Sequence, residues 1–139
     1  VDDALHATRA AIDEGIVPGG GAALLQAKSS VDTNFSDKDE QLGAEILLNA
    51  IEKPFVQILK NAGIEKYHGI LSYCENSPQG YNIKTDKYVD MVKEGIIDPT
   101  KVTRTALENA VSVAGTMLIT ECTVVDNPEK EKTEPQIMM

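Results

Sequence analysis

Three short segments carry residues whose types and spacing could do chemistry, and the first is a glycine triplet. Gly19, Gly20 and Gly21 stand directly before the helix-forming run 22–27. A glycine loop that leads into a helix lets backbone approach a ligand closely, and free N–H groups there favour an anion or a polar group. The triplet also suits tight packing between helices, and it matches neither common glycine-rich phosphate-binding motif. From these residues alone, tight packing is the favoured interpretation.

The other two segments are acidic and stand where helices are expected to begin. Asp98 followed by Pro99 is typical of a helix start, with aspartate as the N-cap and proline in the first turn. Asp2 and Asp3 suit the first turn of another helix, where carboxylates complement the helix dipole. A carboxylate can also accept hydrogen bonds from sugar hydroxyls or orient an attacking water. The pattern alone favours the helix-end role for both segments.

The cysteines and histidines are too scattered to predict a metal or redox site. Cys74 and Cys122 belong to no closely spaced pair, and His6 and His68 are equally isolated. We therefore expect two reduced thiols and no metal site.

Composition narrows the class of protein. The 139 residues are 42% hydrophobic and only 4% aromatic, which predicts an aliphatic, alanine-rich core of ordinary domain size. The net charge of −9, without a basic cluster, argues against nucleic acid or an anionic membrane as a partner. No apolar run approaches the roughly 20 residues that a membrane span needs. The chain starts at Val1 rather than methionine, so we expect part of a longer protein.

Hydrophobic periodicity predicts a mostly α fold with a small β component. The expected helices cover residues 3–14, 22–29, 42–60 and 99–120, with a shorter one at 68–74. Pro54 should either kink the third of these or divide it into two helices. The last long helix is apolar over much of its circumference, which predicts a central position.

The remaining segments are expected to be short strands and loops. Residues 81–84 and 86–89 suit the arms of a β-hairpin, and residues 123–125 suit a strand whose partner lies outside the chain. We expect loops at 16–21 and 29–40.

Four sequence blocks resemble the group I chaperonin family, the 60-kDa subunit of bacteria and organelles. They occur in the family's order and separations, and the resemblance spans about residues 1–128. The blocks are residues 1–11 (VDDALHATRAA), 14–21 (EGIVPGGG), 95–104 (GIIDPTKVTR) and 112–115 (SVAG). The resemblance implies a C-terminal portion of a subunit. Residues 1–15 would end the intermediate domain, 16–126 would form the C-terminal half of the equatorial ATP-binding domain, and 127–139 would be a disordered tail.

The family resemblance also implies an activity and partners. Such a subunit couples ATP hydrolysis to the folding of non-native proteins, in stacked heptameric rings of identical subunits closed by a co-chaperonin lid. The lid and unfolded polypeptides bind an apical domain, and the phosphate cradle and Mg²⁺ ligand also lie outside this chain. The implied cofactors are thus ATP and Mg²⁺. The implied location is the bacterial cytoplasm, with the mitochondrial matrix or plastid stroma as alternatives.

Seven positions match functional residues of the family. Asp3 matches the aspartate that activates the attacking water, Gly20 a glycine whose backbone lies at the ribose, and Asp98 the acceptor of the ribose hydroxyls. The adenine contacts would come from Asn82, Ile83, Lys84 and Ile96. Because many members carry Ala-Ala where Ile83 and Lys84 stand, only backbone contacts carry over at those two positions. The tail also lacks the Gly-Gly-Met repeats usual in the family.

Two other functions remain open at this point. The chain could be a non-catalytic helical module for oligomerisation or interaction, which gel filtration with light scattering would reveal as a discrete monomer or dimer. A small independent phosphate-binding domain built on Gly19–Gly21 is disfavoured, because no lysine or arginine stands near the triplet. As a chaperonin portion, the chain alone should have negligible ATPase activity.

Overall fold

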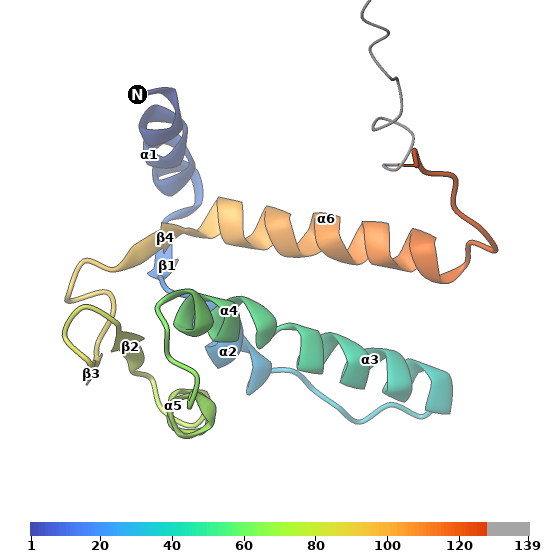
Figure 1. Ribbon diagram of the computed structural model, residues 1–139, viewed down its shortest axis with the longest axis horizontal. Helices are drawn as coiled ribbons and strands as arrows, with labels where there is room; N and C mark the ends of the chain where they lie inside the picture. The colour runs from blue at the N-terminus through green and yellow to red at the C-terminus, as the bar shows by residue number, and fades with distance from the viewer. Residues whose placement is uncertain (128–139) are drawn as a thin grey trace, which may run out of the picture. The chain divides into compact units, whose positions relative to one another are not determined.

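The computed structural model describes residues 1–127, and it is mostly helical with two small sheets, as predicted (Figure 1). The chain consists of two compact units, Val1–Ala106 and the part from Leu107 onward. The elements in order are α1 (Asp2–Glu14), β1 (Ile16–Pro18), α2 (Ala22–Lys28), α3 (Lys38–Ala50), α4 (Lys53–Asn61), α5 (His68–Glu75), β2 (Gly80–Asn82), β3 (Lys87–Val89), β4 (Ile97–Pro99) and α6 (Thr100–Leu118). The predicted disordered tail lies, from residue 128, outside the described residues.

The first sheet joins two segments that are about eighty residues apart in the chain. β1 pairs antiparallel with β4, and Val17 lies opposite Asp98 (Figure 1). The prediction of a loop at residues 16–18 was therefore wrong, because these residues form backbone hydrogen bonds with a distant strand. The pairing continues past the strands, since the Thr100 N–H donates to the Gly15 carbonyl at 3.0 Å. The glycine triplet and the start of α6 are thus anchored to one another.

The helix start predicted at Asp98 needs correction for the same reason. Asp98 belongs to β4 and α6 begins at Thr100. An Asp98 cap could bind the backbone N–H of Thr100 or of Lys101, and the first of these is already bonded to Gly15. Within residues 1–127, the Asp98 carboxylate accepts no hydrogen bond and is exposed.

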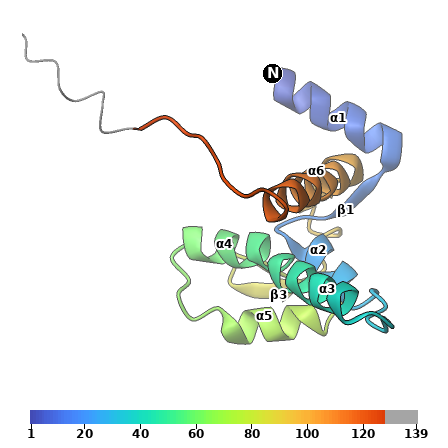
Figure 2. The same cartoon turned by 90° about the vertical axis from the view of Figure 1, so that its right-hand side faces the viewer.

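The hydrophobic core of the first unit lies among α2, α4 and α5. Its fully buried members are Leu25, Phe55, Leu59 and Cys74. The segment 62–67 crosses from α4 to α5 (Figure 2), and Ile64 and Tyr67 from this segment pack against the core. Burying these side chains stabilises the unit by roughly 1.5–3 kcal/mol for each fully buried large apolar residue. Apart from Phe55, Cys74 and the flanking tyrosines the core is aliphatic, as predicted, but it is not alanine-rich, because Ala22 is the only alanine among the buried residues that the structure describes.

The long helix predicted at 42–60 is two helices, one of the two outcomes expected from Pro54. The break falls at residues 51–52, and Pro54 lies in the first turn of α4. Proline has no N–H to donate to the preceding turn, and its ring excludes a straight continuation. α3 begins four residues earlier than predicted, because Asp37 caps it by accepting from the N–H groups of Asp39 and Glu40.

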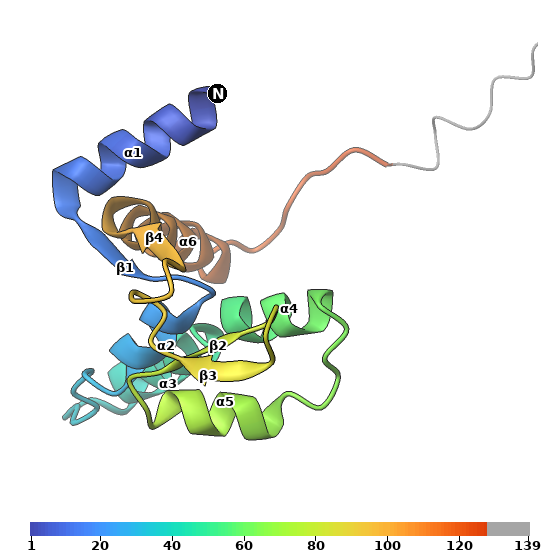
Figure 3. The ribbon, with the colours of Figure 1, turned by 90° about the vertical axis from the view of Figure 1, so that its left-hand side faces the viewer.

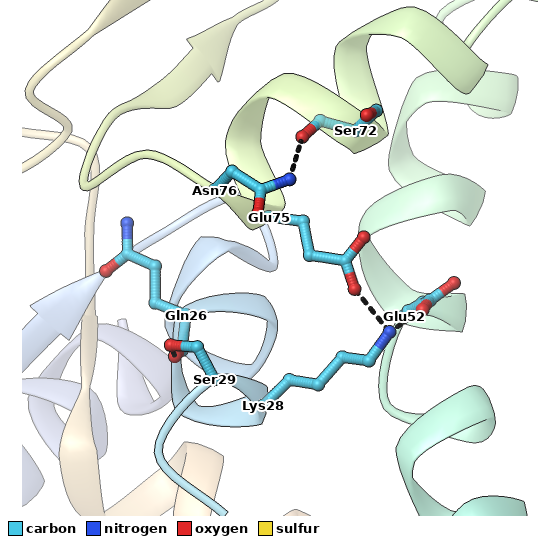
Figure 4. Close-up of polar contacts among 7 residues, drawn as sticks. All are labelled: Gln26, Lys28, Ser29, Glu52, Ser72, Glu75 and Asn76. Atoms are coloured by element: carbon cyan, nitrogen blue, oxygen red, sulfur yellow. Dashed lines mark hydrogen bonds and ion pairs between the residues drawn. The ribbon is translucent and has the colours of Figure 1, made fainter.

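A three-residue ion cluster joins α2 to α4 and α5. The Lys28 ammonium donates to the carboxylates of both Glu52 and Glu75 (Figure 4). The two hydrogen bonds raise the pKa of Lys28, with partial desolvation opposing them. Asn76 adds a hydrogen bond from its amide to the Ser72 carbonyl at the end of α5. The ion cluster therefore links the end of α2 to the start of α4 and to the end of α5, the two helices that share the hydrophobic core with α2.

The second sheet is the predicted β-hairpin. β2 pairs antiparallel with β3, and Tyr81 lies opposite Tyr88. Figure 3 shows the hairpin beside α5, and α5 contacts β2. The Tyr81 hydroxyl donates to Asp86 at 3.2 Å, which closes the hairpin loop. Partial desolvation, and then this carboxylate, raise the pKa of Tyr81.

The C-terminal part of the described chain differs from two expectations. No residue of α6 is buried, although its apolar circumference predicts a central helix. Residues 122–127 form no strand in the structure, so the strand predicted at 123–125 is absent here. A strand requires a partner for its backbone hydrogen bonds, and the described chain pairs none with this segment. Among the described residues, no helix has the length and apolarity needed to span a bilayer.

Candidate functional site

A cavity of about 580 Å³ in the first unit brings most of the predicted site residues together. Its volume lies within the range of about 300–1,000 Å³ typical of small-molecule sites. Its walls come from the glycine triplet, α4, the β2–β3 hairpin and the turn before β4. The lining residues are Gly20, Phe55, Ile58, Leu59, Tyr81, Asn82, Ile83, Lys84, Met91, Glu94, Gly95, Ile96 and Ile97.

The glycine triplet forms one edge of this cavity through close backbone packing. The Gly19 N–H donates to the Ile96 carbonyl at 2.8 Å, and a Cβ on Gly19 would lie 3.1 Å from the same oxygen. A Cβ on Gly20 would lie 3.1 Å from the Met91 methyl group. Gly19 thus packs against a turn and not against a helix. The close approach to a helix expected from the sequence occurs at Gly21, where a Cβ would lie 2.8 Å from the Phe55 backbone in α4, and Gly20 borders the cavity. Close packing and a place beside a possible ligand site therefore occur at neighbouring residues of the triplet.

The hairpin supplies three of the four predicted adenine contacts, Asn82 at the end of β2 and Ile83 and Lys84 in the loop. The Asn82 side-chain oxygen accepts from the Lys84 backbone N–H at 3.0 Å, which turns the chain at the cavity. Ile83 is half-buried and packs on the hydrophobic core. Asp86 in the same loop has a φ of 52°, a left-handed conformation that aspartate tolerates in turns. The loop is thus held at both ends by side-chain hydrogen bonds.

The turn before β4 packs against the glycine triplet and also lines the cavity. The Ile96 N–H donates to the Met91 carbonyl at 2.8 Å, and both residues line the cavity. Asp90 stabilises this turn by accepting from the Lys93 backbone N–H at 3.2 Å. That hydrogen bond is the main reason why the pKa of Asp90 is lowered. Asp98 does not line the cavity but lies one residue beyond the lining residue Ile97.

Asp3, the predicted water-activating residue, is not brought to the cavity. It lies exposed in the first turn of α1, and α1 contacts β4 near its other end. Two ion pairs anchor that end to the first turns of α6, Asp13–Lys101 at 3.1 Å and Glu14–Arg104 at 2.6 Å. The hydrogen bond from Arg104 lowers the pKa of Glu14. Because both pairs are exposed to solvent, they hold α1 only weakly.

Sequence reasoning missed several lining residues that the structure reveals. Met91 is 3% exposed and forms a wall of the cavity beneath Gly20 and Gly80. Phe55 and Leu59 face the cavity from α4, and Glu94 adds a carboxylate at its edge. The apolar periodicity of α4 marked Phe55 and Leu59 as core residues, but no pattern in the sequence distinguishes Glu94 from other surface glutamates.

The described residues include no group of three or more histidine, cysteine or acidic side chains placed to hold a metal ion. The cavity therefore offers apolar walls, backbone groups and two charged side chains, Lys84 and Glu94. Such a lining suits a flat, partly polar organic group rather than a bare cation.

Two comparisons with known proteins relate this arrangement to a family. Residues 1–128 match the model of the TCP-1/cpn60 chaperonin family. The fold is similar to a solved structure described as the crystal structure of a group III chaperonin in the open state. The TM-score is 0.70 at 29% sequence identity, over 83% of this chain and 25% of the other. The chain thus spans about a quarter of the length of the chaperonin that it resembles.

Proposed function

Because the chain belongs to the TCP-1/cpn60 chaperonin family, we propose that it forms the adenine and ribose side of the ATP site in a group I chaperonin subunit. One observation carries this proposal. Gly20, Ile96 and residues 82–84, which stand far apart in the sequence, line a single cavity. The proposal for group I in particular is supported by the sequence blocks 14–21 and 95–104.

The cavity would hold the base against apolar walls, with the ribose toward β4. Ile83 and Ile96 provide flat apolar contacts for a purine. Asp98 would accept hydrogen bonds from the ribose hydroxyls, and its carboxylate is exposed with no hydrogen bond within residues 1–127. Gly20 lets backbone approach the sugar without a side chain between them.

Asp3 would orient the attacking water only after α1 moves toward the cavity. Its carboxylate suits that role, because phosphoryl transfer needs a group that positions the nucleophile. The exposed ion pairs of Asp13 and Glu14 hold α1 weakly enough to let it swing. In this proposal, hydrolysis therefore depends on the position of α1.

The rest of a longer subunit would supply what this chain lacks. The phosphate cradle, the Mg²⁺ ligand and an apical domain for unfolded polypeptides and a co-chaperonin lid would lie elsewhere in the protein. Identical subunits would assemble into heptameric rings, and we propose the bacterial cytoplasm as their location. Exposed apolar side chains on α6 support burial against further protein, including Val113, Met117 and Leu118, which are 60–79% exposed.

Those same side chains also favour the second candidate function, a non-catalytic helical interaction module. Such a module would bury α6 against a second copy of this chain and give a discrete dimer in light scattering. It would bind no nucleotide, so the binding experiment below separates the two functions.

The ribose contact provides the sharpest test of the proposed function. ADP and 2′,3′-dideoxy-ADP are titrated into the chain and followed by NMR. Loss of a hydrogen bond to a charged group costs about 1.5–3 kcal/mol, so the dideoxy nucleotide should bind at least about tenfold more weakly. In Asp98→Ala the two nucleotides should bind equally, whereas in the control Asp32→Ala the preference should remain. Equal binding by the unmodified chain would refute the ribose assignment.

Activity gives a second and independent check. The chain alone should show negligible ATP hydrolysis, because the phosphate cradle lies outside it. Magnesium-dependent turnover by the chain that disappears in Asp3→Ala would contradict this division of the site.

A further inference from the structure

Three of the chain's four tyrosines gather where α5 lies beside the β2–β3 hairpin (Figure 3). Tyr73 comes from α5, Tyr81 from β2 and Tyr88 from β3. The ring centres of Tyr73 and Tyr88 lie 4.0 Å apart with the planes tilted by 36°, whereas Tyr81 meets Tyr88 edge-on at 5.5 Å. Aromatic pairs usually have ring centres about 4.5–7 Å apart. Tyr73 and Tyr88 are therefore an unusually close pair.

Both members of this pair are open to solvent. Tyr73 is 44% exposed and Tyr88 is 39% exposed, and the Tyr73 hydroxyl donates to the side-chain oxygen of Gln79 at 2.9 Å. The chain has no tryptophan, so no indole competes with these phenols for an oxidant. Cys74, the next residue after Tyr73, is buried, and burial raises the pKa of its thiol to about 11. That thiol stays protonated at neutral pH and is a poor competitor as well.

We propose that a one-electron oxidant joins Tyr73 to Tyr88 as an intramolecular dityrosine, which fastens α5 to β3. Each phenol loses one electron to the oxidant and one proton to water. The two phenoxyl radicals then pair their electrons in a bond between ring carbons that stand beside the hydroxyl groups. The hydrogen on each bonded carbon leaves as a proton while the oxygen takes one up, which restores both phenol rings. The pair loses two hydrogen atoms in total, and no nucleotide is involved.

The fold favours this pair over the other close tyrosine. Two reactants that are held together couple in an effectively unimolecular step. In the linked product the ring centres lie about one ring diameter plus one bond length apart, close to the separation that Tyr73 and Tyr88 already have. Tyr81 is farther from Tyr88, its ring is turned by 64°, and its hydroxyl is bonded to Asp86. Tyr81 is nonetheless closer to Tyr88 along the chain, so the identity of the partner separates an effect of the fold from one of sequence.

Photo-oxidation and peptide mapping test the proposal. The 139-residue chain is illuminated in dilute solution with a ruthenium photosensitiser and persulfate, which accepts the two electrons and becomes two sulfate ions. Trypsin then separates residues 67–84, which contain the other three tyrosines, from residues 88–93, which contain Tyr88. Mass spectrometry should find these two peptides joined within one chain, with the loss of two hydrogen atoms. Fragment ions should place the link at Tyr73.

Tyrosine-to-phenylalanine variants provide matched controls, because they keep the aromatic ring and remove only the phenol. Tyr73→Phe and Tyr88→Phe should each abolish the link. Tyr81→Phe should retain it, as should Tyr67→Phe, whose ring lies against His68. In concentrated urea, where the fold no longer holds the pair together, Tyr81 should replace Tyr73 as the main partner. A link at Tyr81 in the folded chain, a link only between chains, no link, or an unchanged preference for Tyr73 in urea would each overturn the proposal.

Discussion

Replacing Gly21 by alanine should destabilise the first unit both through the backbone conformation and through overlap with backbone atoms. Gly21 has a φ of 77°, in the left-handed region that costs an L-residue about 1–2 kcal/mol. The new Cβ would lie 2.8 Å from both the N and Cα atoms of Phe55. Those atoms are backbone at the start of α4 and cannot rotate away, so overpacking adds about 1–3 kcal/mol. The free energy of unfolding should therefore fall by about 2–5 kcal/mol.

Two other glycines separate the backbone cost from the overlap. Gly63 has a φ of 81°, and nothing lies within 4 Å of its Cβ position, so Gly63→Ala should cost only about 1–2 kcal/mol. Gly43 lies inside α3 with nothing within 4 Å, so Gly43→Ala should stabilise the helix by about 0.5–1 kcal/mol. Urea unfolding followed by far-UV circular dichroism gives all three values. A cost for Gly21→Ala no greater than that for Gly63→Ala would refute the packing argument.

Two further predictions concern a lysine and the cysteines of the same fold. Lys28→Met leaves the Glu52 and Glu75 carboxylates facing one another without their cation, and should lower the free energy of unfolding by about 2–4 kcal/mol. Because folding raises the pKa of Lys28, the stabilisation by this residue should be complete at neutral pH and should decline as the pH rises above 10.5 through the folded pKa. Urea unfolding of the unmodified protein and of Lys28→Met from neutral pH to above 10.5 measures the difference in their free energies of unfolding. A difference that stays constant with pH would contradict the ion-pair origin. Burial raises the pKa of the Cys74 thiol to about 11, while Cys122 is exposed. A thiol reagent at neutral pH should therefore modify Cys122 first and Cys74 only on unfolding, as read by mass spectrometry, and equal rates would show that Cys74 is accessible.

Local patterns predicted the helices well because each has its own periodicity or boundary residue. Pro54 marked the division between α3 and α4, and Gly63 follows the end of α4. The early start of α3 was predictable too, since Asp37 followed by Glu40 has the spacing of a capping box. The hairpin followed from two short arms of β-forming residues around a polar loop.

The β1–β4 pairing could not be predicted from local sequence. Each strand has three residues and contains a proline, and the partner lies about eighty residues away. Asp98–Pro99 consequently suggested a helix cap, although Asp98 lies in β4 and the Gly15 carbonyl occupies one of the N–H groups that the cap could bind. Residues 123–125 have strand-forming types but form no strand in the described chain, and the partner expected for them lies outside it.

Some residues of the candidate site could be predicted from the sequence and others could not. The resemblance to chaperonins identified Gly20, Ile96 and residues 82–84, which the cavity brings together. Spacing alone favoured packing or helix ends for Gly20 and Asp98. Glu94 was missed as a lining residue, because its place at the cavity depends on which distant segments meet there and not on its neighbours in the chain.

The β1–β4 ladder also determines where the chain can change length. None of the cavity's lining residues comes from positions 21–54, although that segment separates Gly20 from Phe55 in the sequence. The ladder joins the glycine triplet to the turn before α6 without using that segment, and the polar loop at residues 29–37 is exposed. Insertions or deletions in this loop would alter the surface between α2 and α3 and leave the edges of the cavity in place. Variation in length can therefore accumulate close to the glycine triplet in the sequence while the geometry of the cavity is retained.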